Sequence, residues 1–340
     1  MDWLYKLSYY LYFFLILIIY LDYDNAYRLV AGVICHLGDV PIPREEDEEF
    51  AGGTVEETGA IFGAARKGHY CVGAFNTNNL EWTRAILKGA QEKNVPVLIQ
   101  VSMGAAKYMG GYKLVRNLVA DEMEAMNITV PVVMHLDHGN YEAAKECIEA
   151  GFSSVMFDGH DLPLEENLAK TKEIVELAHA HGMSVEAEVG SIGGTEDGIT
   201  GAGELASVED ATKMAATGVD YLACGIGNIH GKYPADWAGL NFDRLKEIAD
   251  ALPDMPLVLH GGSGIPQEQI EKAISLGVSK LNINTECQLA FADATRKYIE
   301  AGKDQEGKGY DPRKLLAPGT QAITDTVEEI IGWMGTPSID

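Results

Sequence analysis

Positive charge is scarce in this 340-residue chain. It has 26 lysines and arginines against 51 aspartates and glutamates, so the formal net charge is −25 and the pI is near 4.6. Nucleic-acid binding requires a cationic face for the phosphates, and adhesion to anionic lipid requires one too. We therefore expect no nucleic-acid partner. The hydrophobic share of 46% is ordinary for a globular protein and excludes disorder over most of the chain.

Closely spaced cysteines are missing as well. The five cysteines are odd in number and far apart, and no C-x-x-C motif occurs; they are Cys35, Cys71, Cys147, Cys224 and Cys287. This pattern excludes a disulfide framework and a structural zinc–thiolate site. A reducing, cytoplasmic location is the expectation.

The one long uncharged stretch, Leu7–Leu21, is short for a membrane span, which needs about 20 residues. No small-residue cleavage pattern follows it, as a signal peptide would require. Three interpretations stay open: a membrane or interfacial anchor, a buried or crystal-contact helix, and a segment outside the natural protein. We assign residues 1–53, including the acidic linker Pro41–Phe50, to an N-terminal extension, and residues 54–340 to one globular domain. Membrane contact is expected only if the hydrophobic segment is genuine.

From Thr54 onward, short apolar runs alternate with helical runs. Eight runs indicate strands: Tyr70–Asn76, Pro96–Ser102, Pro131–Asp137, Ser154–Gly159, Ser184–Gly190, Tyr221–Gly227, Pro256–Gly264 and Lys280–Thr285. Several helical runs stop at a glycine just before a strand, which is a helix C-terminal signal. Eight strand-then-helix units favour an α/β fold of the (β/α)₈ or TIM-barrel type. An open doubly wound sheet is the alternative, but the G-x-G-x-x-G turn it often carries is absent after the first strand.

In a barrel of this type, chemistry takes place at the C-terminal ends of the strands. Polar residues gather at that end of all eight expected strands. His138, His230 and His260 each precede a glycine there, and three protein ligands with an open position are the layout of a catalytic zinc site. A structural role for these histidines is the alternative. Asp137 suits a general base beside a metal, or a group that orients a metal-binding histidine.

Three further features extend this candidate site. Asp158 and Glu188 could hold the ligands in place, offer an alternative metal position, or form ion pairs in the mouth of the barrel. The run Gly261-Gly262-Ser263-Gly264 follows the seventh strand, where barrels often bind phosphate, although such a run can be a plain turn. The segment 190–198 has glycines around an acidic centre, which indicates a mobile lid or a solvated loop.

The motifs HLDHG, FDG, EAEVGSIGGTEDG, GNIHG, LHGGSGIP and NINTE, in this order, resemble the class II, zinc-dependent fructose-bisphosphate aldolases. The similarity covers about Thr54 to about Pro318. It is greatest to the shorter-loop branch, which also contains tagatose-bisphosphate aldolases. The resemblance implies a TIM barrel and a reversible cleavage of fructose 1,6-bisphosphate into dihydroxyacetone phosphate and glyceraldehyde 3-phosphate.

The resemblance also implies roles for individual residues. His138, His230 and His260 match the catalytic zinc ligands, and Asp158 and Glu188 match positions for a second or displaced divalent metal. Asp137 matches the acid/base on the C4 hydroxyl, and Glu196 matches the carboxylate of a mobile loop. The expected phosphate and monovalent-cation contacts are Ser102, Gly231, Gly261, Gly262, Ser263, Asn282, Ile283, Asn284 and Thr285.

Partners and alternatives follow from the same resemblance. We expect phosphorylated ketose and triose substrates, a homo-dimer or homo-tetramer, and a cytoplasmic enzyme of glycolysis. Many relatives carry a phosphate-binding lysine after the tyrosine that Tyr233 matches, but Pro234 occupies that place here. Lys232 is the one lysine expected near the mouth of the barrel. Lys280 is expected at the start of the last strand, which is the opposite end. A tagatose 1,6-bisphosphate aldolase, a non-catalytic membrane-tethered binding protein and a barrel metallohydrolase are the alternatives.

Overall fold

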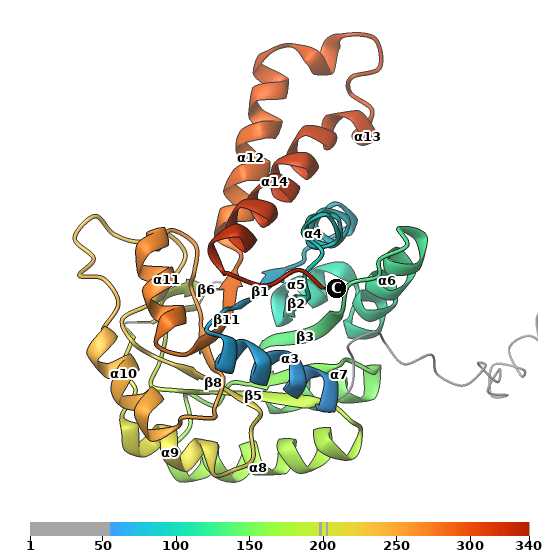
Figure 1. The fold of residues 1–340 in the computed structure, drawn as a ribbon. Coiled ribbons are helices and arrows are strands. Elements are labelled where there is room, and N and C mark those ends of the chain that lie inside the picture. Colours follow the sequence, from blue (N-terminus) through green and yellow to red (C-terminus); the bar gives the residue numbers. More distant parts are fainter. Residues whose placement is uncertain (1–54, 197–198, 202, 340) are drawn as a thin grey trace, which may run out of the picture. The chain divides into compact units, whose positions relative to one another are not determined.

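The computed structural model describes residues 55–196, 199–201 and 203–339, and its labels are those of Figure 1. The expected hydrophobic segment 7–21 and the boundary at residue 53 lie outside the described residues. Eight parallel strands close into a barrel in the order β1-β11-β10-β8-β5-β4-β3-β2. The barrel strands are β1 Val72–Asn76, β2 Val97–Ser102, β3 Val132–Gly139, β4 Ser154–Phe157, β5 Ser184–Val189, β8 Tyr221–Cys224, β10 Leu257–Leu259 and β11 Val278–Ile283. The predicted TIM barrel is confirmed.

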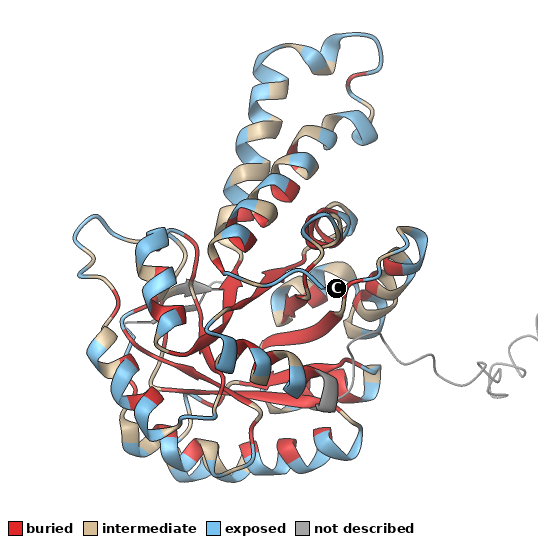
Figure 2. Cartoon of the chain, viewed as in Figure 1, coloured by how far each residue is buried: buried red, intermediate tan, exposed pale blue. Residues whose placement is uncertain are grey.

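Helices surround the barrel, and most of them bury one side and expose the other (Figure 2). They are α4 Leu80–Lys93, α5 Met103–Met109, α6 Tyr112–Ala125, α7 Tyr141–Ala150, α8 Leu164–Ala180, α9 Val208–Ala215, α10 Phe242–Ala251, α11 Gln267–Ser275, α12 Thr285–Glu300, α13 Pro312–Leu315 and α14 Ala317–Trp333. A short 3₁₀ helix spans Lys303–Gln305. The helices α12 and α14 pack on each other as a pair that extends from the barrel in Figure 1. No helix in this described part of the chain is long and apolar enough to cross a membrane.

The helix-stop glycines act as the sequence indicates. Gly151 is the C-cap of α7 with φ of 78°, and its backbone N–H bonds back to the last turn of the helix. Gly182, Gly218 and Gly277 also have positive φ. Glycine is favoured here because the left-handed region is costly for residues with a Cβ.

The helix α3, Val55–Gly68, closes the N-terminal end of the barrel. Its Phe62 is fully buried in an apolar cluster with residues of the barrel interior. The Phe62 ring lies 4.7 Å from that of Tyr221, the first residue of β8. The interior is therefore apolar at this end, and the polar side chains described below lie toward the other.

The observed strand limits differ from the expected ones at one or both ends of every strand, and the largest difference is in the seventh strand. The seventh stops at Leu259 instead of Gly264, because Gly261 takes a φ of 64° that turns the chain out of the sheet. The last strand ends at Ile283, and Thr285 begins α12. The segment after β5 is a hairpin of β6 Gly193–Glu196 and β7 Ile199–Gly201, where a loop was expected.

Candidate metal centre and active site

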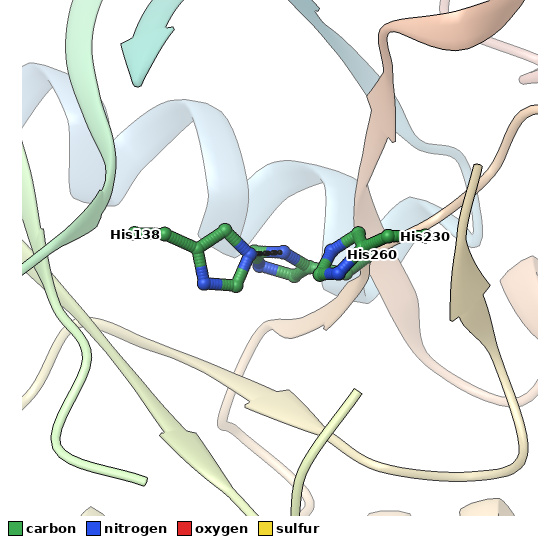
Figure 3. Close-up of side chains that lie close together, drawn as sticks. All are labelled: His138, His230 and His260. Atoms are coloured by element: carbon green, nitrogen blue, oxygen red, sulfur yellow. Dashed lines mark hydrogen bonds between the residues drawn. The ribbon is translucent and has the colours of Figure 1, made fainter. Parts of the chain in front are cut away.

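Three histidines from separate parts of the chain meet at the C-terminal mouth of the barrel (Figure 3). His138 lies in β3, His230 in β9 (Ile229–His230), and His260 directly follows β10. One nitrogen of each ring lies within 4.8 Å of the corresponding nitrogens of the other two. His138 also has a φ of 48°, which few residues other than glycine adopt and which is typical of functional sites. The structure thus brings together the predicted triad.

Two of these rings are held by carboxylates on the side away from the triad. Asp158 Oδ2 lies 2.7 Å from His138 Nδ1, and Glu186 Oε1 lies 2.7 Å from His260 Nε2. The remaining nitrogens, His138 Nε2 and His260 Nδ1, face each other at 2.8 Å. Histidines that bind metal usually donate their other N–H to a carboxylate, which fixes the tautomer and the ring. The residues therefore fit a divalent metal that prefers imidazole ligands, such as zinc.

Asp137 is 1% exposed and receives three hydrogen bonds from amide groups. Asn76 and Gln100 donate to Oδ2 at 2.8 and 3.3 Å, and Asn282 donates to Oδ1 at 3.2 Å. Burial alone would raise the pKa of Asp137, but the neighbouring histidines, the buried Lys280 and the hydrogen bond from Asn76 outweigh it and place the pKa below its usual range. Asp137 is thus a fixed carboxylate beside the triad, able to accept a proton from a group bound in the mouth.

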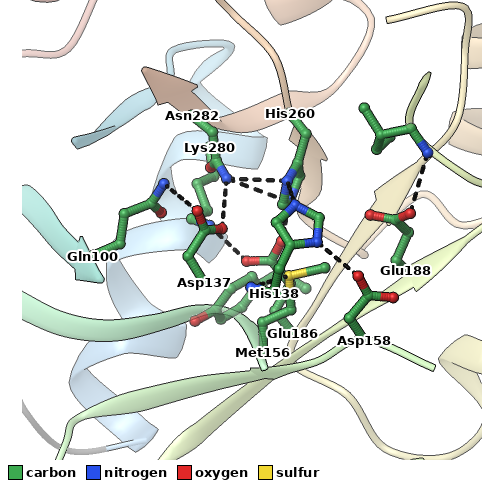
Figure 4. A network of polar contacts seen from close by, with 12 residues as sticks. Gln100, Asp137, His138, Met156, Asp158, Glu186, Glu188, His260, Lys280 and Asn282 are labelled. Carbon is green, nitrogen blue, oxygen red and sulfur yellow. Dashed lines mark hydrogen bonds and ion pairs between the residues drawn. The ribbon is translucent and has the colours of Figure 1, made fainter. Parts of the chain in front are cut away.

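Asp158 and Glu188 form a second cluster around His138 (Figure 4). Asp158 also bonds His160, whose Nδ1 lies 2.7 Å from Oδ1, and this bond raises the pKa of His160 to about 9. Burial and the charge of Asp158 raise the pKa of Glu188 to about 8. Glu188 Oε1 accepts from the Ile192 backbone at 3.3 Å, while Oε2 is buried and has no hydrogen-bond partner among the described residues. A buried, unpartnered oxygen beside Asp158 fits a second position for a divalent cation.

A cavity of about 150 Å³ opens beside the triad. It is lined by Asn76, Asp137, His230, Gly231, Gly261, Ser263, Asn282, Asn284, Thr285 and Gln288. Gly261 is required here, because a Cβ on its backbone would lie 2.0 Å from the carbonyl oxygen of Ile229. The lining is rich in amides, a hydroxyl and glycine backbone, which suits an anionic group held by neutral donors. Lys232 is not among these residues.

Three expected phosphate contacts lie outside this cavity. Gly262 and Ile283 do not line it. Ser102 caps α5, where its Oγ accepts from the Ala105 backbone at 3.3 Å, and it is paired with Asp137 across β2 and β3. Ser102 is therefore at the mouth but apart from the cavity, while Gly231, Ser263 and the other predicted residues line it.

The phenol of Tyr233 connects the two loops that carry His230 and His260. Its hydroxyl donates to the Gly261 carbonyl at 2.8 Å and accepts from the Ile229 backbone at 3.0 Å. Burial raises the pKa of Tyr233, so the hydroxyl keeps its proton. The Trp237 ring packs against it with centroids 4.2 Å apart. One side chain thus fixes the residues next to two of the three candidate ligands.

The hairpin that bears Glu196 is paired with the strand that carries His230. Its strand β6 pairs in parallel with β9, with Gly194 opposite His230. A Cβ at Gly194 would lie 2.1 Å from the His230 carbonyl oxygen, so only glycine permits this approach. Glu196 is the last residue of β6, where its backbone is paired with that of Ile199 in β7.

Sequence reasoning missed several interior residues. Asn76 and Gln100 hold Asp137, Gln288 lines the cavity, and Glu186 and Lys280 form an ion pair of 2.7 Å below it. The expectation that Lys280 lies away from the site was wrong, since this pair reaches His260. Side chains two positions apart in a strand share a face. Stepping back two residues from Ser102, Glu188 and Asn282 would have located Gln100, Glu186 and Lys280.

Comparisons with known proteins agree on one family. The family model "Fructose-bisphosphate aldolase class-II" matches residues 56–338. The chain is 63% identical over 279 residues to the fructose-bisphosphate aldolase of Streptococcus pneumoniae serotype 4, covering 80% of this chain and 95% of the relative. It is 61% identical over 278 residues to that of Streptococcus pyogenes serotype M3, with the same coverage. The crystal structure of fructose-bisphosphate aldolase from Campylobacter jejuni superposes with a TM-score of 0.70 at 26% identity, covering 83% of this chain and 95% of that one.

Proposed function

Since the chain belongs to the class II fructose-bisphosphate aldolase family, whose members are metal-dependent aldehyde-lyases, we propose that it cleaves fructose 1,6-bisphosphate reversibly. The products are dihydroxyacetone phosphate and glyceraldehyde 3-phosphate. One observation carries the proposal: the buried Asp137 carboxylate and His230 line the same cavity as the glycine and hydroxyl groups of the phosphate cradle. Relatives of 60–63% identity, all named fructose-bisphosphate aldolase, favour fructose over tagatose as the sugar.

The reaction breaks the C3–C4 bond of a β-hydroxy ketone. Zn²⁺ held by His138, His230 and His260 would supply Lewis acidity for the C2 carbonyl, which is worth several kcal/mol of charge stabilisation. Asp137 accepts the proton of the C4 hydroxyl, since its carboxylate is ionised and fixed by three amides. The C4–O electron pair forms the aldehyde of glyceraldehyde 3-phosphate, and the C3–C4 pair stays on the dihydroxyacetone fragment. Glu196 then delivers a proton to C3.

Substrate phosphates serve as handles that position the reacting carbons. In our proposal the dihydroxyacetone phosphate end lies in the cradle of Gly231, Gly261, Ser263 and the 282–285 segment. Gly262 and Ile283 support this cradle from outside the cavity, and Ser102 contacts the other phosphate. A monovalent cation would balance the phosphate charge, because the cavity is lined by no lysine or arginine of the described part of the chain.

The remaining assignments extend this proposal. Asp158 and Glu188 provide the position for a second or displaced divalent metal, as the unpartnered Glu188 Oε2 supports. The protein acts in the cytoplasm as a homo-dimer or homo-tetramer, with glycolytic sugar phosphates as its small-molecule partners. These assignments are supported by membership of the family.

An aldolase assay with metal control tests the proposal. Chelation should abolish cleavage of fructose 1,6-bisphosphate, and Zn²⁺ or Co²⁺ should restore it. His138→Ala should lose both metal and activity, while His181→Ala should keep both, since the exposed His181 ring bonds the Leu177 carbonyl. Full activity in a preparation shown to be metal-free would overturn the metal mechanism. Metal binding without turnover would favour a binding protein, release of inorganic phosphate a hydrolase, and faster cleavage of tagatose 1,6-bisphosphate the other sugar.

A further inference from the structure

A layer of buried ionisable side chains lies inside the barrel, immediately below the candidate site. Glu186 and Lys280 have fully buried side chains there (Figure 4), and His135 is fully buried beside them. The interior of such a barrel is ordinarily filled by branched apolar side chains. Buried ion pairs are often no more stabilising than apolar residues of the same volume. This layer therefore needs an explanation beyond stability.

Glu186 connects the layer to the triad. Its Oε2 accepts from Lys280 Nζ at 2.7 Å, and its Oε1 lies 2.7 Å from His260 Nε2. A carboxylate that is paired with an ammonium has no hydrogen to give, so Nε2 of His260 must be the donor. The proton of a neutral His260 then sits on Nε2, and the lone pair of Nδ1 faces the mouth. That Nδ1 atom is the one 2.8 Å from His138 Nε2.

We propose that Lys280 and Glu186 are positioning residues that hold His260 in the tautomer able to bind metal through Nδ1. The inference rests on the proposed function, because it takes the triad as the metal site. Lys280 anchors one carboxylate oxygen, which leaves the other aimed at His260. The two residues therefore set the proton position before any metal arrives, while the Asn282 amide, whose Nδ2 lies 3.2 Å from Nδ1, also helps to hold the ring.

The amide variant Glu186→Gln makes the proposal testable, because Lys280 determines the orientation of the new amide group. An ammonium donates only, so Lys280 should hold the amide oxygen and leave the NH₂ group facing His260. His260 Nε2 then becomes an acceptor, and its proton moves to Nδ1. Loss of such a partner of a metal ligand typically weakens metal affinity by about 10–100-fold.

The double variant Glu186→Gln/Lys280→Met gives the opposite expectation. Without the ammonium, the amide is free to turn its oxygen toward His260, which restores the proton to Nε2. We expect part of the lost zinc affinity to return in this protein. A purely structural role predicts instead that the double variant is worse than the single one.

Two measurements are needed. The His260 tautomer is assigned from two-bond ¹H–¹⁵N correlation spectra of metal-free protein, and the zinc affinity comes from competition with a chromophoric chelator. Ser279→Ala is the control, since this buried neighbour on β11 donates to the Gly277 carbonyl and should change neither readout. Thermal unfolding checks that each variant is folded.

The expected result is an Nε2–H tautomer in the unmodified protein, an Nδ1–H tautomer with weakened zinc binding in Glu186→Gln, and recovery in the double variant. An Nδ1–H tautomer in the unmodified, metal-free protein would overturn the inference without any variant. Zinc affinity of Glu186→Gln within twofold of the unmodified protein would also overturn it. Failure of the unmodified protein to bind zinc would instead refute the proposed function.

Discussion

Asn282 donates a hydrogen bond of 3.2 Å to Oδ1 of Asp137, while two other amides occupy Oδ2. The carboxylate is therefore fixed at the edge of the cavity with its charge stabilised. In Asp137→Asn, the proton acceptor is lost, so we expect kcat to fall about 10²–10⁴-fold. Zinc affinity should change little, because Asp137 is not among the candidate ligands.

Steady-state kinetics with a metal titration checks this prediction. Asp220→Asn is a matched control, since Asp220 lies at the far end of the barrel and bonds His179 and the Val185 backbone. Activity of Asp137→Asn within tenfold of the unmodified protein would assign the proton transfer to another group.

Much of the fold and site could be predicted from sequence, because strand runs and the glycines between them are local signals. His138, His230 and His260 stood out because each follows an apolar run and precedes a glycine. Glu186 and Lys280 were missed because they lie inside such runs. The role of each depends on its ion pair with the other, which is 94 positions away in the sequence. The pairing of β6 with β9 was missed for the same reason, since two short glycine-rich segments carry no periodic pattern.

Lysine-dependent aldolases form a Schiff base with their substrate, which requires a neutral amine near the reacting carbonyl. Lys280 does not meet this need, because its ammonium is fully buried and paired with Glu186 at 2.7 Å. Lys232 does not line the cavity. We expect borohydride added with substrate neither to inactivate the protein nor to raise its mass. A reduced adduct found by peptide mass spectrometry at either lysine would contradict the metal mechanism.

The pKa of Glu188 gives a pH dependence to the stability of the metal-free protein. The carboxyl titrates near 4.5 when unperturbed and at about 8 in the fold, so between these values the folded state holds the extra proton. The free energy of unfolding should therefore fall as pH rises through this window, by at most about 1.4 kcal/mol per pH unit for one proton. Glu188→Gln cannot ionise and should have a flatter profile.

Urea unfolding at several pH values between 5 and 8, with metal removed, measures the difference. The contribution of His160, whose pKa is raised to about 9, also falls with rising pH but is present in both proteins. It therefore largely cancels in the comparison. Parallel profiles for the two proteins would show that Glu188 is ionised throughout.

We propose that residues 1–53 are an extension that the catalytic domain does not need. The family match starts at residue 56, and every motif of the site follows it. Deletion of residues 1–50 should leave a folded enzyme with kcat and KM within about twofold of the full chain. Circular dichroism and the aldolase assay test this, and a truncated protein that fails to fold would place the extension in the core.

The helix α3 has a consequence for the order of events in turnover. With Phe62 sealing the N-terminal end of the barrel, ions and substrates share the mouth as their route to the interior. His230 lines the very cavity proposed for the phosphorylated sugar. In the proposed function, a bound sugar would stand between the metal and the solvent. We therefore expect sequential loading, with the metal first and the sugar second, and each departing product would briefly reopen the path by which the metal could leave.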